Sequence, residues 1–197
     1  QKQALNALVF FYRDVCGMEE VRLEVKLRKT KQREPVVLTK VELLALLDRL
    51  EGQYRLAAEL QYGGGLRLGE VVSLRVKDID PIREQVTVRC GKGDRDRTTV
   101  LPKRVKPMLK GALVGARELF DRDRANGAPG VALPGALERK MSRSGERWEW
   151  FWIFPADHLS RDPETGVVRR HHLHPDVYAG NVRRAAAAAG IAKRVTT

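Results

Sequence analysis

The side chains best suited to chemistry in this sequence are Arg67 and Lys92, and both lie next to glycines. Arg67 follows three consecutive glycines at 63–65 and precedes a short helical pattern. A guanidinium beside the free backbone N–H groups of a helix N-terminus is suited to binding an oxyanion such as a phosphate. The alternative is a surface arginine paired with Glu70, three residues further on.

Lys92 lies between two glycines at a turn that joins two segments with strand-like alternation. A lysine on such a turn can reach into a groove and donate a proton or hydrogen bonds. The alternative is an ordinary lysine at a hairpin tip. Three other motifs fail: the glycines do not have G-x-G-x-x-G spacing, the Lys92 turn is not a Walker A loop, and no serine lies in a G-x-S-x-G turn.

Residues 148–174 contain all three tryptophans, at positions 148, 150 and 152, and the run Arg169-Arg170-His171-His172. On a strand the three tryptophans would share one face, which suits either a hydrophobic core or the display of rings for stacking bases. The histidines could suggest a metal site. We expect none, because His171 would face away from its neighbours on a strand and no cysteine or acid has supporting spacing.

The surrounding pattern predicts a mainly helical α+β fold that positions these side chains. Thr39 and Glu42 form a capping box, which starts a helix with an apolar leucine face. The glycines at 63–65 should end the next helix. Alternating valines around the Lys92 turn predict a small antiparallel sheet near residues 78–102. The expected helices are 4–15, one from Thr39 to about Leu50, 54–61, 68–74, 104–122, 136–140 and 175–190.

Charge narrows the class of partner. The 197 residues carry 37 Lys and Arg against 25 Asp and Glu, a net charge of +12. Such a surplus favours a polyanionic partner, either nucleic acid or an anionic membrane surface, over a merely soluble basic protein. No apolar run approaches the roughly 20 residues of a membrane span, and no secretory signal opens the chain. Cys16 and Cys90 lack zinc-ligand spacing, so a reduced cytoplasmic location is expected.

The segment from Arg22 to Arg33 holds six basic residues and one acid, and it ends in Glu34-Pro35. Its composition is typical of a linker between two apolar-periodic segments. It can be a solvated run of charge, or a strap whose side chains, such as Arg28 and Lys31, lie along a phosphate backbone.

Taken together, two segments resemble conserved boxes of the tyrosine recombinases, or phage-type integrases. Residues 62–80, YGGGLRLGEVVSLRVKDID, resemble the first box, and residues 91–102, GKGDRDRTTVLP, resemble the β-hairpin with the active-site lysine. The resemblance implies that Arg67 clamps the scissile phosphate and that Lys92 helps protonate the leaving 5′-oxygen. It also implies a transesterification through a 3′-phosphotyrosyl intermediate, with no metal or nucleotide cofactor, by a tetramer on DNA in the bacterial nucleoid.

A third region narrows the resemblance to the integron integrases. Residues 133–140, the tryptophans, Asp162-Pro163 and the Arg169–His172 run are similar to the insertion that marks this subfamily. Its recombination sites are folded single strands, recognised as hairpins with protruding bases, alongside duplex sites. The resemblance implies that Trp150 stacks on such a base and that Pro163, His171 and His172 line its pocket.

The chain departs from the family pattern at its C-terminal side. The His-x-x-Arg element and the nucleophilic tyrosine have no match, and Tyr178 is in the wrong context. We therefore expect a catalytic domain that lacks its C-terminal part and does not cleave DNA by itself. The expected layout is the end of a helical core-binding domain in 1–20, a basic linker in 21–37, and a partial catalytic domain in 38–197 with an insertion at about 126–174. The alternative is a non-catalytic basic domain that binds protein or nucleic acid.

Overall fold

The computed structural model describes residues 2–18, 20–21, 36–89, 96–135, 137–141 and 143–197. The chain divides into two units, residues 1–35 and 36–197. In the first unit, α1 (Lys2–Phe10) continues into a π-helical turn, Phe11–Val15. Its apolar side chains Leu8, Phe10 and Val15 are exposed. None of the described helices is both long enough and apolar enough to cross a membrane.

Helices form most of the second unit, and their ends follow the capping signals of the sequence. The helix α2 (Lys40–Leu47) begins at the expected capping box, in which the Thr39 and Glu42 side chains each bond the other residue's backbone N–H. The helix α3 (Gly52–Gly64) is longer than expected, because only Gly65 turns left-handed, at φ +61°. The remaining helices are α4 (Leu68–Val72), α5 (Lys106–Ala125), α6 (Leu137–Lys140) and α7 (Pro175–Ala188).

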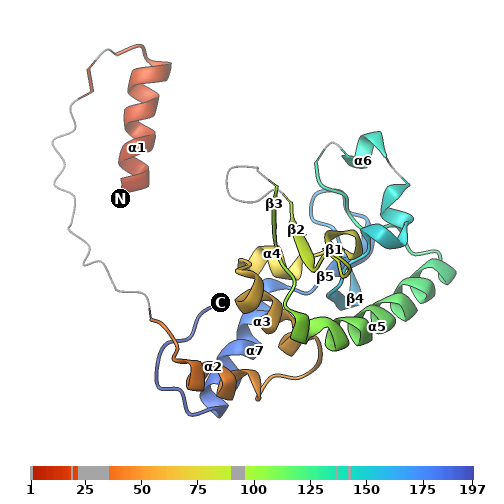
Figure 1. Ribbon diagram of the computed structural model, residues 1–197. Coiled ribbons are helices and arrows are strands. Elements are labelled where there is room, and N and C mark those ends of the chain that lie inside the picture. The colour runs from red at the N-terminus through yellow and green to blue at the C-terminus, as the bar shows by residue number, and fades with distance from the viewer. Residues whose placement is uncertain (1, 19, 22–35, 90–95, 136, 142) are drawn as a thin grey trace. The chain divides into compact units, whose positions relative to one another are not determined.

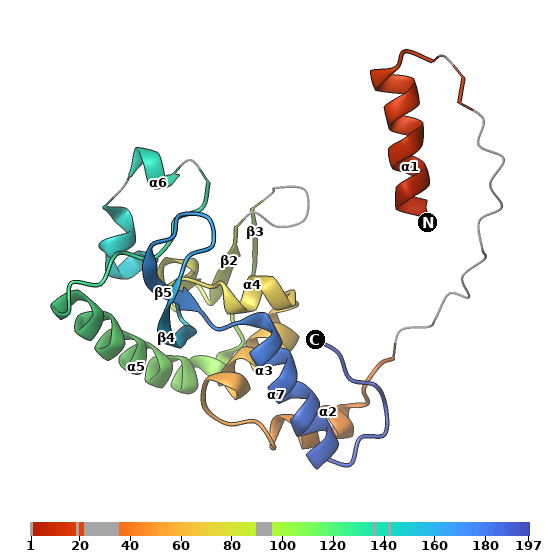
Figure 2. The same cartoon turned by 180° about the vertical axis from the view of Figure 1, so that it is seen from behind.

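The core lies where these helices meet. α7 packs against α2 and α3, and α3 also contacts α5; Figures 1 and 2 show α3 and α7 side by side. Leu47, Leu56, Leu60 and Tyr178 are almost completely buried there. Burial of such side chains is the main stabilising contribution to a fold of this size. The result is a helical body that holds the sheets and loops described next.

Two small antiparallel sheets accompany the helices. The first has the order β1 (Ile79–Asp80), β2 (Gln85–Val88) and β3 (Arg97–Val100), which confirms the predicted sheet; the hairpin turn falls outside the described residues. The second pairs β4 (Pro155–Arg161) with β5 (Val168–His172) and was not predicted. Short 3-10 helices cover Val76–Asp78, Lys103–Val105 and Ser144–Glu146.

The expectation that the three tryptophans share one strand face is wrong. Trp148–Trp150 is a 3-10 helix, closed by the local bonds Trp150 N–H to Arg147 O and Phe151 N–H to Trp148 O. Trp148 packs with Phe120 and Phe151, whereas Trp152 is buried and forms an isolated bridge with Arg75. The tryptophan rings contact different neighbours, so their spacing of two residues does not indicate a strand.

Candidate nucleic-acid interface

Arg67 is held at the start of α4 by the carboxylate of Glu70. The chain leaves α3 at Gly65, and Arg67 takes an extended conformation just before α4. Glu70 Oε2 accepts a hydrogen bond from the Arg67 backbone N–H at 2.8 Å, and Oε1 accepts one from Arg67 Nη1 at 2.6 Å. The ion pair that was the alternative interpretation of Arg67 is therefore present. The catalytic role of Arg67 stays a prediction.

A second arginine, Arg97 of β3, shares the same carboxylate. Its Nη1 and Nη2 each donate to Glu70 at 2.8 Å, and Nη2 also donates to the Gly65 carbonyl at 3.2 Å. These hydrogen bonds from Arg97, with those from Arg67, lower the pKa of Glu70 to about 2 against the opposing effect of burial. Glu70 is therefore ionised at neutral pH.

The cluster still presents positive charge to solvent. The Glu70 side chain is 11% exposed, whereas those of Arg67 and Arg97 are 58% and 37% exposed. Two guanidinium groups on one largely buried carboxylate leave a net charge of about +1 and free N–H donors. This arrangement suits a phosphate oxygen, because arginine binds oxyanions with several N–H donors in one plane.

Three of the predicted phosphate-binding side chains, Lys92, Arg28 and Lys31, lie outside the described residues. The last described pair of the hairpin is Val88 with Arg97, and Arg97 belongs to the Arg67–Glu70–Arg97 cluster. The role of Lys92 stays a prediction.

A pocket of about 480 Å³ adjoins the cluster and has Glu70 in its wall. It lies between β2, the segment after α4, and residues from 134 to 172, and we call it the Trp150 pocket. Its wall combines cations and flat rings with acids: Arg75, Lys77, Arg89, Trp150, Trp152 and His172, together with Glu70, Asp78 and Asp96. Such a combination suits a nucleobase with its phosphate, since bases stack on aromatic rings and phosphates pair with basic side chains.

Trp150 is half-buried in this pocket, and a lysine covers its ring. The Lys77 Nζ lies 2.8 Å from the ring centroid, in a cation–π contact. Burial, followed by the nearby Arg89, lowers the pKa of Lys77 to about 8. The charged form of Lys77 is therefore less favourable here than in water.

Arg75 joins the wall of the pocket to the rest of the fold. Its Nη1 donates to the Trp150 carbonyl at 2.7 Å and its Nη2 to the Ala132 carbonyl at 2.8 Å, while its guanidinium lies 3.9 Å from the Trp152 ring centroid. Burial lowers the pKa of Arg75 to about 10, so it stays charged at neutral pH. Arg75 thus fixes the backbone that carries Trp150.

The structure separates the residues that the resemblance grouped with Trp150. His172 lines the pocket edge-on to Trp152, with Nδ1 2.9 Å from the Leu173 carbonyl, and burial lowers its pKa. His171 alternates to the other side of β5, and Pro163 is exposed at the turn before that strand. Among the described residues no three His, Cys, Asp or Glu side chains form a group that could hold a metal ion.

Sequence reasoning did not single out Glu70, Arg97, Arg75 and Lys77 as members of this site. All four lie within the two boxes quoted above. Local spacing carries a signal only for Glu70, which is one helical turn from Arg67. The contacts of Arg75 span 57 and 75 residues, and those of Arg97 with Glu70 span 27, so the tertiary fold alone reveals them.

Tyr178, which the sequence puts in the wrong context for a nucleophile, lies in the helical core. Its side chain is completely buried, its hydroxyl donates to Gln61 Oε1 at 2.7 Å, and burial raises its pKa. A phosphate in a DNA backbone has no access to this oxygen.

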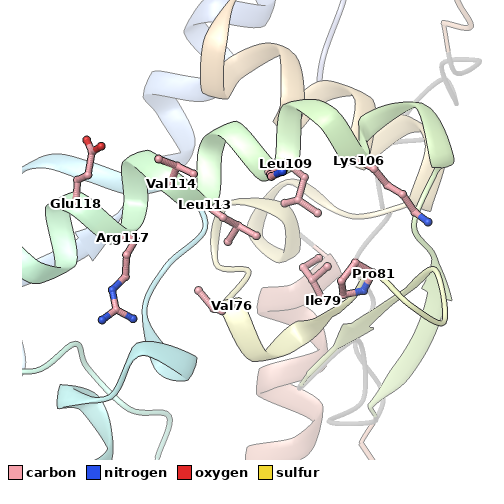
Figure 3. Close-up of a pocket in the computed structure, with 10 residues that line it drawn as sticks. Val76, Ile79, Pro81, Lys106, Leu109, Leu113, Val114, Arg117 and Glu118 are labelled. Carbon is pink, nitrogen blue, oxygen red and sulfur yellow. The ribbon is translucent and has the colours of Figure 1, made fainter.

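A second hollow, of about 720 Å³, lies along α5, and none of the predicted site residues that the structure describes lines it. Figure 3 shows Val76 and Ile79 facing Leu109 and Leu113 of α5, with Arg117 towards one end. Val76 points into this groove, whereas its neighbours Arg75 and Lys77 line the Trp150 pocket. The two hollows therefore lie on opposite sides of the same 3-10 turn.

Comparison with known proteins places this geometry in a family context. Residues 36–197 match the model of the Phage integrase family. Proteins named Integrase/recombinase from Escherichia coli and Pseudomonas aeruginosa are each 45% identical over 196 residues, which covers 99% of this chain and 58% of each relative. The Tyrosine recombinase XerA of Thermococcus kodakarensis is 35% identical over 104 residues, covering 51% of this chain and 36% of that protein.

Solved structures show the same fold. The crystal structure of XerA recombinase aligns with a TM-score of 0.53 at 20% identity, over 98% of this chain and 55% of the other. A post-cleavage complex of XerH site-specific recombinase bound to palindromic difH substrate aligns with a TM-score of 0.55 at 19% identity, over 88% of this chain and 41% of the other. The chain thus spans a little over half the length of the relatives that it matches along nearly all its residues.

Proposed function

From the premise that this chain belongs to the Phage integrase family, the tyrosine recombinases, we propose that it binds and clamps DNA for site-specific recombination. The substrate that we propose is a folded single-stranded integron cassette site with protruding bases, in addition to duplex sites. The reaction of the whole protein would be a transesterification through a 3′-phosphotyrosyl intermediate. It would be carried out by a tetramer.

One observation carries this proposal: Glu70, which accepts hydrogen bonds from Arg67 and Arg97, also lines the Trp150 pocket. The arginine cluster and the pocket are therefore adjacent. A backbone phosphate on the exposed guanidinium groups would leave a neighbouring base within reach of the pocket. The resemblance of residues 133–172 to the integron insertion supports a base that protrudes from a hairpin. The XerH structures, named as complexes with difH substrate, support DNA as the partner.

The proposed chemistry of Arg67 is electrostatic. Charge builds up on the phosphate oxygens in the pentacoordinate transition state, and a guanidinium already held in place stabilises that charge without reorganising. Glu70 and Arg97 would keep Arg67 in position. Lys92 would donate a proton to the leaving 5′-oxygen.

The proposed layout of the chain follows the family pattern: the end of a core-binding domain, a basic linker with Arg28 and Lys31 along the phosphate backbone, and catalytic-domain residues with an insertion at about 126–174. The insertion would contribute Trp150 and His172 to the base-binding pocket. As the resemblance implies, Pro163 and His171 would also contact the protruding base.

The test compares the affinity of this chain for three DNAs: a hairpin with one protruding thymine, the same hairpin without it, and a plain duplex. We expect the protruding base to strengthen binding, because stacking contributes roughly 1 to 3 kcal/mol, or about 5- to 150-fold. The Trp150→Ala variant should lose this preference and retain the salt-dependent binding common to all three DNAs. Trp150→Phe, which keeps an aromatic ring, should retain part of the preference for the protruding base.

Three outcomes contradict the proposal. Equal affinity of the chain for the three DNAs would remove the base-binding role of the pocket. Displacement of every bound DNA by heparin, with no preference for DNA shape, would favour the alternative of a basic protein-interaction domain. An equal loss on all three DNAs for Trp150→Ala would show that Trp150 supports the fold and not the recognition of a base.

A further inference from the structure

The ring of Trp150 is already occupied. The Lys77 ammonium lies 2.8 Å from the ring centroid, and both side chains line the same pocket of about 480 Å³. A base stacked on this face would take the volume that the ammonium fills. Lys77 and a stacked base therefore exclude each other on this face.

Lys77 is free to leave the ring, unlike the other cation beside it. With the residues that the structure describes, Lys77 has no hydrogen bond or ion pair, whereas Arg75 is fixed by the carbonyls of Ala132 and Trp150. Two acids lie nearby: Asp78 accepts from the Arg75 backbone and from Arg89, and Asp96 forms an ion pair with Arg89. The flexible four-carbon stem of a lysine allows its ammonium to move while its backbone and Cβ stay in place.

We propose that Lys77 is a specificity-determining residue that covers Trp150 in the free protein and moves to the phosphate of a protruding nucleotide when that base stacks on Trp150. This inference rests on the proposed base-binding role of the pocket. A plain duplex supplies phosphates but no base for the ring, so Lys77 stays on Trp150 with that DNA. A protruding base supplies both, and the new ion pair replaces the cation–π contact that is lost.

The local electrostatics favour this exchange. Lys77 lies among the cations Arg75 and Arg89, and its pKa is lowered to about 8, chiefly by burial. The acids in the wall already have partners: Asp78 accepts from the Arg75 backbone and from Arg89, and Asp96 pairs with Arg89. A phosphate brought into the pocket by a protruding nucleotide would therefore offer Lys77 an anionic acceptor of its own. The move thus improves the surroundings of the ammonium only when a nucleotide enters.

The test is the salt dependence of binding by the parent chain and by Lys77→Met, which keeps a long apolar side chain without the charge. Each phosphate neutralised by a cation adds about 0.7 to 0.9 to the slope of log affinity against log salt. We expect Lys77→Met to lower the slope by about this amount on the hairpin with a protruding base. The slopes should be unchanged on a plain duplex and on the same hairpin with an abasic nucleotide at the protruding position.

Lys77→Arg and Lys110→Met are the matched controls. Lys77→Arg retains a cation and should keep the parent slope on the protruding-base hairpin. Lys110 is an exposed lysine of α5 that lies outside the Trp150 pocket. Its variant should show no difference specific to that hairpin.

A second measurement needs no substitution. The ε-CH₂ protons of Lys77 in the free chain should show an upfield ring-current shift in the NMR spectrum, because they lie over an indole. The shift should disappear when the protruding-base hairpin is added and persist with duplex or abasic hairpin. An unchanged shift with all three DNAs would overturn the proposal.

The outcomes separate the two proposals. If the parent chain prefers the protruding base but Lys77→Met keeps the parent slope, the role of Lys77 is wrong and the pocket remains. If Lys77→Met lowers the slope equally on all three DNAs, Lys77 is an ordinary phosphate contact, which also overturns the exchange. If the parent chain has no preference for the protruding base, the proposed function of the pocket fails first and this inference fails with it.

Discussion

Glu70 shows how one carboxylate can set the position of two cations that lie far apart in the sequence. It accepts hydrogen bonds from both Arg67 and Arg97, with donor–acceptor distances of 2.6 to 2.8 Å. The pair with Arg67 follows from helical spacing. The pair with Arg97 requires the register of β2 with β3 and the departure of α4 from α3.

The pH dependence of stability should report this contact. Because the pKa of Glu70 falls from 4.5 to about 2 on folding, its ionised form stabilises the folded chain by about 3 kcal/mol at pH 7. This contribution is complete above pH 4.5 and is lost as pH falls towards 2. In urea unfolding, Glu70→Gln should be less stable than the parent by up to that amount at pH 7. At pH 3 the difference should be less than about half as large.

Glu118→Gln is the control for this prediction, because Glu118 is an exposed acid of α5. Its stability should follow that of the parent at both pH values. A difference between Glu70→Gln and the parent that stays constant from pH 7 to pH 3 would contradict the assigned pKa.

The helices and loops differ in how far the sequence specifies them. Thr39 with Glu42, and the glycines before Leu66, mark helix ends through bonds to the nearest turn, so these ends were predictable. The Trp148–Trp150 turn was not, because its rings are distributed between Phe120 on α5 and the cations of the pocket. Period-two spacing is ambiguous when the partners on the two sides come from distant segments.

A pair of glycines explains how the loop after α5 is held. The Val131 backbone N–H donates to the Gly145 carbonyl at 3.0 Å. A Cβ at Gly145 would collide with the Val131 carbonyl oxygen, and a Cβ at Gly130 would collide with the backbone of Gly145. We expect Gly145→Ala to lower the free energy of unfolding by more than about 2 kcal/mol, since a backbone shift would be required.

The comparison for this prediction is Gly111→Ala on α5, where an added Cβ meets no atom within 4 Å. Alanine should stabilise this helix by roughly 0.5 to 1 kcal/mol, because glycine loses more backbone entropy on folding. Urea unfolding should show a lower free energy of unfolding for Gly145→Ala and a higher one for Gly111→Ala, which would verify the close approach of Gly145 to the Val131 backbone. Changes of the same sign in both variants would contradict it.

A buried ion pair joins the end of α5 to β5, at the two ends of the proposed insertion. Arg170 donates to Asp123 at 2.6 and 2.8 Å, and both side chains are less than 10% exposed. Removing one partner leaves a buried charge without compensation, so Asp123→Asn should cost about 3 to 5 kcal/mol of stability.

The same helix supplies an exposed pair as the reference. Arg117 and Asp121 are 3.0 Å apart, and each is about half exposed. Asp121→Asn should cost less than about 0.5 kcal/mol, because water screens such a pair. Denaturant midpoints of the two variants give the comparison. A loss of similar size for both would show that the Asp123–Arg170 pair does not hold the loop to the helical body.

The net charge of +12 belongs to the chain as a whole, and its contribution to binding should be independent of DNA shape. The double variant Arg28→Gln, Lys31→Gln tests the proposed strap. It should lower the slope of log affinity against log salt by up to about two, to the same extent on hairpin and duplex. Fluorescence anisotropy over a range of salt concentrations measures both slopes.

The control is the double variant Lys103→Gln, Lys110→Gln, which removes the same number of positive charges from the second unit. A smaller change in slope than for the linker variant is expected, because the proposed strap follows the phosphate backbone. Equal changes in the two double variants would show that the linker acts only through total charge.

The burial of α7 against α2 and α3 also has a consequence for synthesis on the ribosome. The hydroxyl of Tyr178 bonds to Gln61, a residue made 117 positions earlier. At translation rates of 5 to 20 residues per second, about 6 to 23 s separate the appearance of the two partners. During that interval the leucines of α2 and α3 lack the helix that covers them, so the nascent chain presents a surface for chaperones. Sequence changes that delay α7 should therefore lower the yield of folded chain even where they leave its final stability unchanged.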